Sequence, residues 1–168
     1  FFHPYFFKRL WRPEINLRSH RKIVVIDGCT GFTGGINITD DENEAIRDDA
    51  YVDLHFRISG EIVRWLQLAF VADWLYAGGR FAADDRYFPV PSETAGPVTA
   101  QVLAAGPDTP FEPIHRAQVF AINAARKRVL LVTPYFVPSE SAMMALTSAA
   151  LRGVDTALVV PLRSDNLM

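Results

Sequence analysis

The stretch His20-Arg21-Lys22-Ile23-Val24-Val25-Ile26-Asp27 decides the local fold and anchors the rest of the interpretation. Six residues separate it from Gly34-Gly35-Ile36-Asn37, and together they form the pattern H-x-K-x4-D-x6-G-[GS]-x-N. The β-branched run predicts a strand over 21–26 that ends at an Asp-Gly turn, and a short strand over 31–35 completes a hairpin. A nucleophile, a cation and an amide are thus collected within 18 residues.

This pattern predicts phosphoryl transfer. Alternate residues of a strand face the same way, so His20 and Lys22 are expected to project together, about 7 Å apart. An imidazole can attack phosphorus and leave again, because its pKa lies near neutrality. Lys22 would neutralise the charge that builds on the phosphate oxygens, and Asn37 would add a directed hydrogen bond. Gly34 and Gly35 would permit close backbone approach at the phosphate.

A nucleophilic histidine also needs a partner on its other ring nitrogen. One candidate is Asp53, which shares one side of a strand predicted over 51–58 with His55 and Arg57. The other is Asp27, whose parity on its strand is opposite to that of His20. An Asp before Gly is often only a turn former, so parity and turn chemistry favour Asp53.

The composition is that of a globular chain, with 168 residues, 49% hydrophobic and 21% charged. A net charge of −2 argues against a general nucleic-acid binder. The single cysteine, Cys29, rules out an internal disulfide. No apolar run reaches about 18 residues, so no transmembrane helix is predicted in this chain.

The organisation changes along the chain. A deeply packed helix is predicted over 61–77, followed by two glycines that end it. Prolines and glycines then gather in 81–97, which is predicted to be a linker. The two parts that it separates are 1–80, with the motif, and 98–168.

The second part alternates strands with helices. Strands are predicted over 98–103, 129–133 and 156–160, the last two buried, and helices over 114–126 and 139–152. Such alternation indicates a parallel or mixed sheet covered by helices, so the predicted fold class is α/β.

These motifs resemble the signature of the phospholipase D superfamily, and within it the bacterial cardiolipin synthases. The signature is matched at His20, Lys22, Asp27, Gly34, Gly35 and Asn37. Wider stretches that are similar to cardiolipin synthases lie at 2–4, 16–22, 31–37, 53–60, 106–108, 121–125, 133–138 and 149–155.

The resemblance implies a phospholipase D-like mixed sheet flanked by helices, present as partial copies of two repeats. The resemblance also implies that two such motifs, one from each repeat, come together in one active site. One histidine forms a phosphohistidine, the other protonates the leaving alcohol, and a phosphatidyl group passes between phosphatidylglycerol molecules without metal or cofactor. By position, Lys22, Asn37 and Gly35 would hold the phosphate, and Asp53 would support His20.

The chain departs from the family in having one H-x-K sequence. We therefore expect a piece of a longer protein of the bacterial inner membrane, holding the end of one repeat and the start of the next. Its second motif is expected about 60–80 residues beyond Met168. The alternatives are a hydrolase or nuclease of the same superfamily and a non-catalytic lipid-binding half-site.

Overall fold

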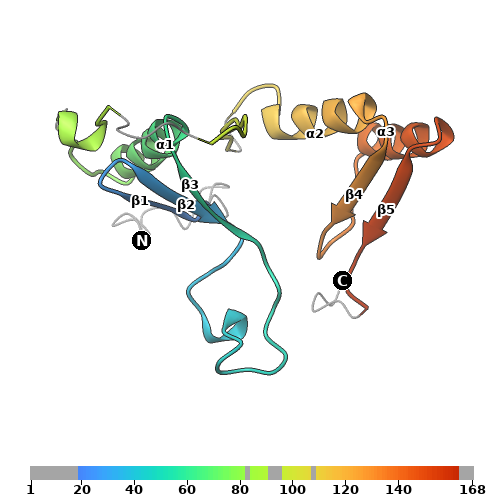
Figure 1. The fold of residues 1–168 in the computed structure, drawn as a ribbon, viewed down its shortest axis with the longest axis horizontal. Coiled ribbons are helices and arrows are strands. Elements are labelled where there is room, and N and C mark those ends of the chain that lie inside the picture. Colours follow the sequence, from blue (N-terminus) through green and yellow to red (C-terminus); the bar gives the residue numbers. More distant parts are fainter. Residues whose placement is uncertain (1–18, 82–83, 91–95, 107–108, 163–168) are drawn as a thin grey trace, which may run out of the picture. The chain divides into compact units, whose positions relative to one another are not determined.

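The computed structural model describes residues 19–81, 84–90, 96–106 and 109–162. The similar stretch at 2–4, residues 16–18 of the stretch at 16–22, and residues 107–108 of the stretch at 106–108 lie outside these ranges. The chain divides into two compact units, 1–104 and 105–168. Helices and two small sheets occur together, which confirms the α/β class (Figure 1). The predicted repeat boundary at 81–97 stays a prediction.

Unit 1 is built on a three-stranded antiparallel sheet of order β1-β2-β3. Its strands are β1 (Ile23–Ile26), β2 (Thr30–Gly34) and β3 (His55–Ser59). Asp27 and Gly28 link β1 to β2 with φ of 53° and 65°. A central pair with positive φ matches the right-handed twist of a hairpin and favours Asp-Gly. The predicted hairpin is confirmed, and the third strand begins four residues later than predicted.

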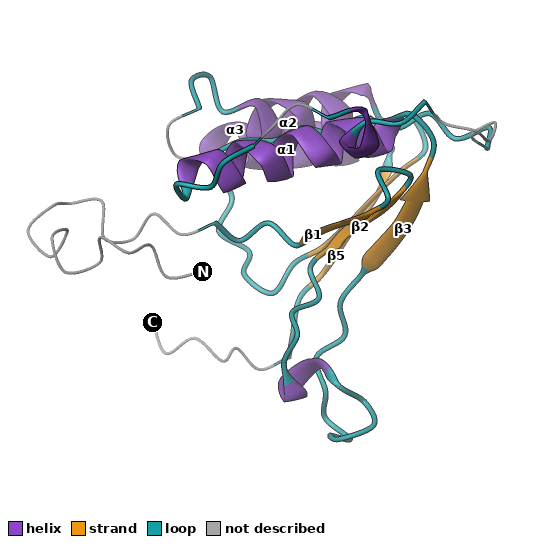
Figure 2. Ribbon diagram, turned by 90° about the vertical axis from the view of Figure 1, so that its left-hand side faces the viewer, coloured by secondary structure: helices purple, strands orange, loops and turns teal. Residues whose placement is uncertain are grey.

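Helix α1 (Ile62–Tyr76) covers one face of this sheet (Figure 2). A Cβ placed on Gly31 would lie 2.9 Å from the Leu66 side chain, so the glycine lets helix and sheet approach closely. The prediction that α1 is packed deeply is wrong for its outer side. Trp65 is 60% exposed and Leu68 47%, because only one side of the helix meets the sheet in the described part of the chain.

A long connection leaves the sheet between β2 and β3 (Figure 1). It contains the short 3-10 helix η3 (Asp40–Glu42). Arg47 pairs with Asp41 and with Asp49, the latter at 2.9 Å. The Tyr51 backbone N–H donates to the Asp41 carbonyl at 2.9 Å, so this loop is held by its own hydrogen bonds. A second 3-10 helix, η4 (Asp85–Tyr87), follows α1.

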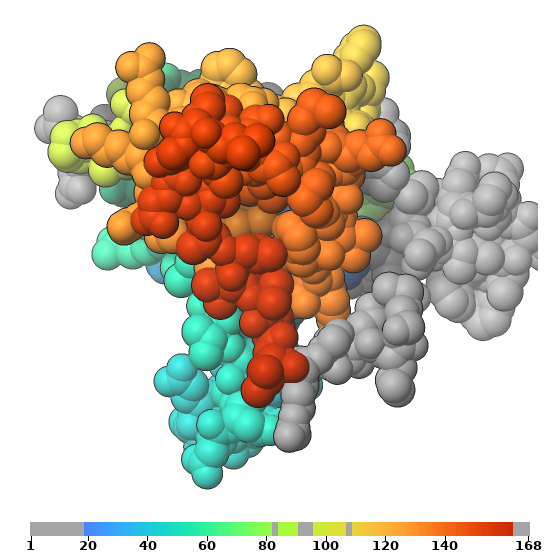
Figure 3. All heavy atoms as spheres, turned by 90° about the vertical axis from the view of Figure 1, so that its right-hand side faces the viewer, coloured from blue at the N-terminus to red at the C-terminus, as the bar shows by residue number. Residues whose placement is uncertain are grey.

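Unit 2 alternates helices and strands, as predicted. Its elements are α2 (Pro113–Ala124), β4 (Arg128–Val132), α3 (Glu140–Leu151) and β5 (Asp155–Val159). β4 and β5 are parallel, and α2 packs on α3. The red atoms of α3 and β5 lie beside the orange atoms of β4 in Figure 3. Ser139 caps α3 by accepting from the Ala142 N–H at 3.2 Å.

Two predictions for the second part are wrong. Residues 98–103 form no strand, because no described strand pairs with them, and Val98 is 82% exposed. β4 is not fully buried either. Leu130 is 65% and Val132 76% exposed, because the helices cover one face of this two-stranded sheet within the described residues.

Candidate functional site

His20 stands just before the sheet. The β1–β2 ladder starts at the pair Ile23↔Thr33, so residues 19–22 precede it, and His20 is exposed. On either side of His20, Ser19 donates to Asp73 Oδ2 at 3.3 Å and Arg21 Nη1 donates to Asp73 Oδ1 at 2.5 Å. Asp73 belongs to α1. Since alternate residues of an extended segment point to opposite sides, His20 projects away from α1.

Lys22 lies on the sheet face that α1 leaves uncovered. Continuing the register by one residue places Lys22 opposite Gly34, which is itself paired with His55. Residues paired across antiparallel strands share a face. The next row on this face pairs Phe32 with Arg57. A cation and an imidazole are therefore neighbours across a glycine that has no side chain.

At both motif glycines, another part of the chain lies so close to the backbone that a side chain would not fit. A Cβ on Gly34 would overlap the Leu54 carbonyl oxygen and lie 2.6 Å from the His55 Cα. A Cβ on Gly35 would overlap the carboxylate of Asp53. The sequence predicted close backbone approach at these positions, but not that Asp53 and His55 make it.

Asp53 lies outside the sheet ladder. Its Oδ1 accepts the Leu54 backbone N–H at 2.6 Å, and its carboxylate lies over Gly35. No hydrogen bond joins it to His20 among the described residues. Asp27 sits in the hairpin turn, seven residues beyond His20, which is about 23 Å at about 3.3 Å per residue. No hydrogen bond joins Asp27 to His20 within the ranges that the structure describes.

Asn37 is held by the β2–β3 loop. Its Nδ2 donates to Glu42 Oε1 at 2.7 Å and its backbone N–H to Oε2 at 2.6 Å. A side-chain amide has two N–H donors and one acceptor oxygen. Within the described ranges, one N–H and the oxygen of the Asn37 amide therefore stay available for a ligand while Glu42 fixes its orientation.

Other polar groups near this face were missed or left open by sequence reasoning. The His55 Nδ1 is buried without a hydrogen-bond partner. Asp73 was not singled out, although it is the sole carboxylate within α1, a signal that stood in the sequence. Outside the site, the Arg47 hydrogen bond holds the pKa of Asp49 below its usual value, and Arg86 does the same for Asp84.

Two cavities of unit 1 border the motif, one at Asp27 and one at Asn37, but His20 and Lys22 line neither of them. One of about 530 Å³ follows β1 and is lined by Gln67, Phe70 and Tyr87, among others. Another of about 510 Å³ lies beside Asn37, but Asp40, Glu42 and Glu44 line it, which is unfavourable for an anion. Within the described ranges, no group of three or more His, Cys, Asp or Glu residues is arranged to bind a metal.

Several curated proteins are similar to this chain. The cardiolipin synthase of Alkalihalophilus pseudofirmus is 42% identical over 156 residues, covering 90% of this chain and 30% of that protein. The cardiolipin synthase of Geobacillus thermodenitrificans is 42% identical over 159 residues, covering 90% and 31%. Cardiolipin synthase A of Yersinia pseudotuberculosis is 36% identical over 168 residues, covering 95% and 34%. No protein-family model matches the chain.

Fold and motif together define an α/β protein with a phospholipase D-like signature. The chain is a homologue of bacterial cardiolipin synthases over nine-tenths of its own length, which confirms the resemblance predicted from the motifs. It spans about a third of the length of the curated relatives that it matches. None of the helices in the described ranges is long and apolar enough to cross a membrane.

Proposed function

We propose that this chain supplies one half of a phosphatidyl-transfer site that acts on phosphatidylglycerol at a membrane surface. The observation that supports it most is the arrangement around the motif. His20 projects away from α1, and Lys22 lies on the uncovered sheet face beside His55. The relatives are named cardiolipin synthases, and transfer between phosphatidylglycerol molecules is the reaction that the resemblance implies.

In this proposal the imidazole of His20 attacks phosphorus, so that a P–N bond forms as the P–O bond to glycerol breaks. The ammonium of Lys22 balances the charge on the non-bridging oxygens, which is the usual role of a fixed cation in phosphoryl transfer. The free N–H of the Asn37 amide donates to one of them. The hydroxyl of a second phosphatidylglycerol then attacks phosphorus and releases His20.

The leaving alcohol needs a proton, and one histidine cannot both bond to phosphorus and donate that proton. This chain has one H-x-K-x4-D sequence. We propose that a second histidine, from another segment of the intact protein or from another copy, donates it. The two histidines exchange roles if His20 is the acid instead of the nucleophile. For the same reason we expect the 168-residue chain alone to have little or no activity.

Asp53 is the proposed support for His20, because Asp27 lies about 23 Å along the chain from it. The carboxylate of Asp53 already lies at the motif, over Gly35. In this proposal the carboxylate of Asp53 turns from Gly35 to the imidazole of His20. Replacing Asp53 by Asn should therefore lower transfer far more than replacing Asp27 by Asn.

The test is His20→Ala in the intact protein, assayed with phosphatidylglycerol vesicles and with products separated by mass. Loss of a nucleophile or a general acid costs on the order of 10³-fold or more in kcat. Unchanged transfer would reject the assignment. Phosphatidic acid in place of cardiolipin as the product would identify water as the acceptor, and hence a hydrolase. Turnover by the isolated chain would contradict the half-site.

A further inference from the structure

We propose that Asp73 is the positioning residue of this site: it sets the direction in which His20 points by binding the residues on both sides of it. This inference rests on the proposed role of His20. Within the described residues, the hydrogen bonds of Asp73 go to Ser19 and Arg21 and not to the His20 imidazole or the Lys22 ammonium. Asp73 therefore acts only through Ser19 and Arg21.

The segment that carries His20 needs such an anchor. Strand β1 and its ladder begin at Ile23, three residues after His20. A histidine that must approach phosphorus in line has to be held within a fraction of an ångström. The side chains of Ser19 and Arg21, both bound to Asp73, hold the segment ahead of the ladder.

The geometry of the contact fixes a direction as well as a position. The two oxygens of Asp73 take different donors, with Oδ2 bound to Ser19 and Oδ1 bound to Arg21. Pinning residues i−1 and i+1 to one side of an extended segment sends residue i to the other side. His20 therefore points away from α1, and Lys22 lies on the same uncovered side of the sheet.

The contact with Asp73 also gives the two cations that follow His20 different roles. Arg21 and Lys22 are the two cations that directly follow His20 in the sequence. Arg21 donates to Asp73, and the side chains of the pair are only 31% and 35% exposed. A neutralised guanidinium competes weakly for phosphate. Asp73 thus directs the positive charge of Arg21 towards α1 and leaves the phosphate to Lys22.

Helix stability does not explain Asp73. It lies in the last turn of α1, which ends at Tyr76 and has no basic residue in that turn. A carboxylate at the negative end of the helix dipole is unfavourable. The buried apolar residues of α1 are Val63, Leu66, Ala69 and Val71. Asp73 is therefore unfavourable for the stability of α1, whereas its contacts stabilise the segment around His20.

The test is Asp73→Asn in the intact protein, with kcat and KM measured on phosphatidylglycerol vesicles. Asn keeps the shape and one acceptor oxygen but loses the charge that holds Arg21. We expect kcat to fall by about 10- to 100-fold, with KM changed less than about threefold, because Lys22 is untouched. Ser19→Ala, which removes one hydroxyl and leaves α1 intact, should lower kcat in the same way but less. Glu61→Gln removes a charge at the other end of α1, where no side-chain cap is made, and should change nothing.

A second measurement does not depend on transfer. Diethyl pyrocarbonate modifies exposed imidazoles, and mass spectrometry gives the rate at His20 relative to His115 of unit 2. Asp73→Asn should change this ratio by about threefold or more, because His20 is no longer held in one direction. An unchanged ratio with unchanged kcat overturns the proposal, and so does a fall in kcat that only follows a fall in melting temperature. If His20→Ala keeps full transfer, the proposed function has failed instead, and the modification ratio alone decides on Asp73.

Discussion

The two sheets of this chain differ in what they leave uncovered. Each has one face covered by helices within the described residues. The uncovered face of β1–β3 carries Lys22 and His55 in one row and Arg57 in the next. The uncovered face of β4–β5 carries Arg128 and Asp155 at one end and then apolar pairs, Leu130 with Ala157 and Val132 with Val159. Similar layers thus present different chemistry.

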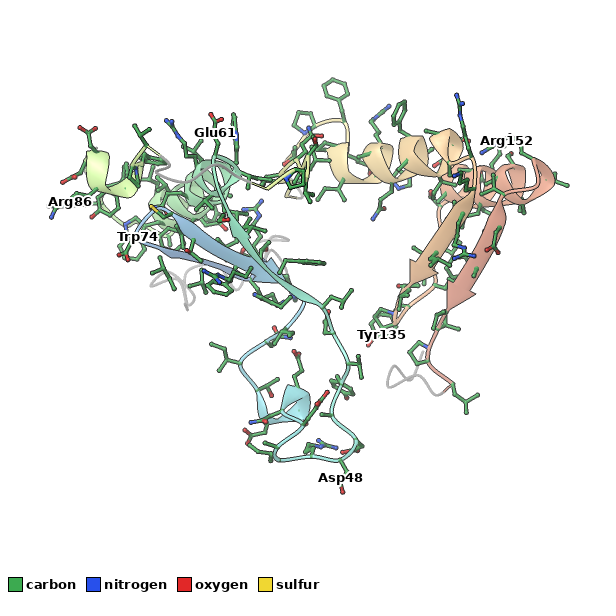
Figure 4. All side chains as sticks on the ribbon, in the orientation of Figure 1. Asp48, Glu61, Trp74, Arg86, Tyr135 and Arg152 are labelled. Atoms are coloured by element: carbon green, nitrogen blue, oxygen red, sulfur yellow. The ribbon has the colours of Figure 1, made fainter. Side chains whose placement is uncertain are left out.

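The candidate site therefore depends on which side chains the strand pairing places on the uncovered face, and not on the α/β layering that both sheets share. Fold alone does not imply function, because sites are built from particular side chains on a shared scaffold. Unit 2 has exposed polar residues too. Figure 4 shows Tyr135 beyond the end of β4 and Arg152 at the end of α3. Arg152 binds the Ile122 and Asn123 carbonyls, which is a C-cap contact of α2.

The largest effect is expected when a cation is removed from one uncovered sheet face and not from the other. Lys22→Gln in the intact protein should lower kcat/KM for transfer by about 10²- to 10³-fold, because a preorganised charge opposite the phosphate is lost. Arg128→Gln is the matched control on the other sheet. Arg128 is bound to Asp155 at 2.6 Å on an exposed surface, and such pairs contribute little. Equal losses for the two variants would show that the uncovered faces are not different in function.

The next effect concerns Gly34. In Gly34→Ala the new methyl group meets the Leu54 carbonyl and the His55 Cα, and neither can move without parting β2 from β3. Overpacking of this kind costs about 1–3 kcal/mol of stability. A melting curve of the intact protein would show it. Gly96→Ala, where no atom lies within 4 Å, should leave the curve unchanged. A neutral Gly34→Ala would mean that β3 does not approach as closely as described.

Gly35→Ala should act on transfer more than on stability. Its methyl group meets a side chain, the Asp53 carboxylate, which can rotate away. If Asp53 supports His20, displacing it lowers kcat by about tenfold, or about 1.4 kcal/mol. In an Asp53→Asn background the same change should cost little more, because the two variants remove one interaction. Independent, fully additive losses would separate Gly35 from Asp53.

The elements of this fold were readable from local sequence. The Asp27-Gly28 turn and the alternation after residue 97 predicted the hairpin and the helix–strand order, because turn chemistry and periodicity are local properties. What covers each element is not local. The exposed outer side of α1 at Trp65 and the unpaired 98–103 segment depend on which partners are present.

For the site, spacing predicted His20 and Lys22, but not what holds them. Asp73 lies 53 residues after His20 in the sequence, and its contacts with Ser19 and Arg21 come from the packing of α1 on the sheet. The same holds for Gly35, whose neighbour Asp53 is 18 residues away. Such contacts follow from tertiary packing, on which strand and helix periodicity carry no information.

A smaller effect compares the helices of the two units at their first turns. Ser139 Oγ accepts the Ala142 N–H of α3, whereas Glu61, at the start of α1 in Figure 4, makes no side-chain cap. Ser139→Ala should cost about 1 kcal/mol, and Glu61→Ala should be close to neutral. Thermal unfolding of the two variants measures the difference. Equal melting temperatures would mean that the hydrogen bonds of Ser139 with the cap and with His115 do not stabilise unit 2.

The smallest effect is a pH dependence confined to the β2–β3 loop. Hydrogen bonding by Arg47 lowers the pKa of Asp49 in the folded chain. A lowered pKa stabilises the folded loop above the unfolded value of about 4, and the gain is lost as the pH falls through the folded value. Hydrogen exchange at 37–53, corrected for intrinsic rates, should therefore lose protection as the pH falls below the unfolded value of about 4. The loop of unit 2 at 133–138 contains no carboxylate and should not respond. Arg47→Gln should reduce protection of 37–53 already at neutral pH and weaken its pH dependence. If 37–53 and 133–138 respond alike, the acid response belongs to the whole chain and not to the loop that orients Asn37.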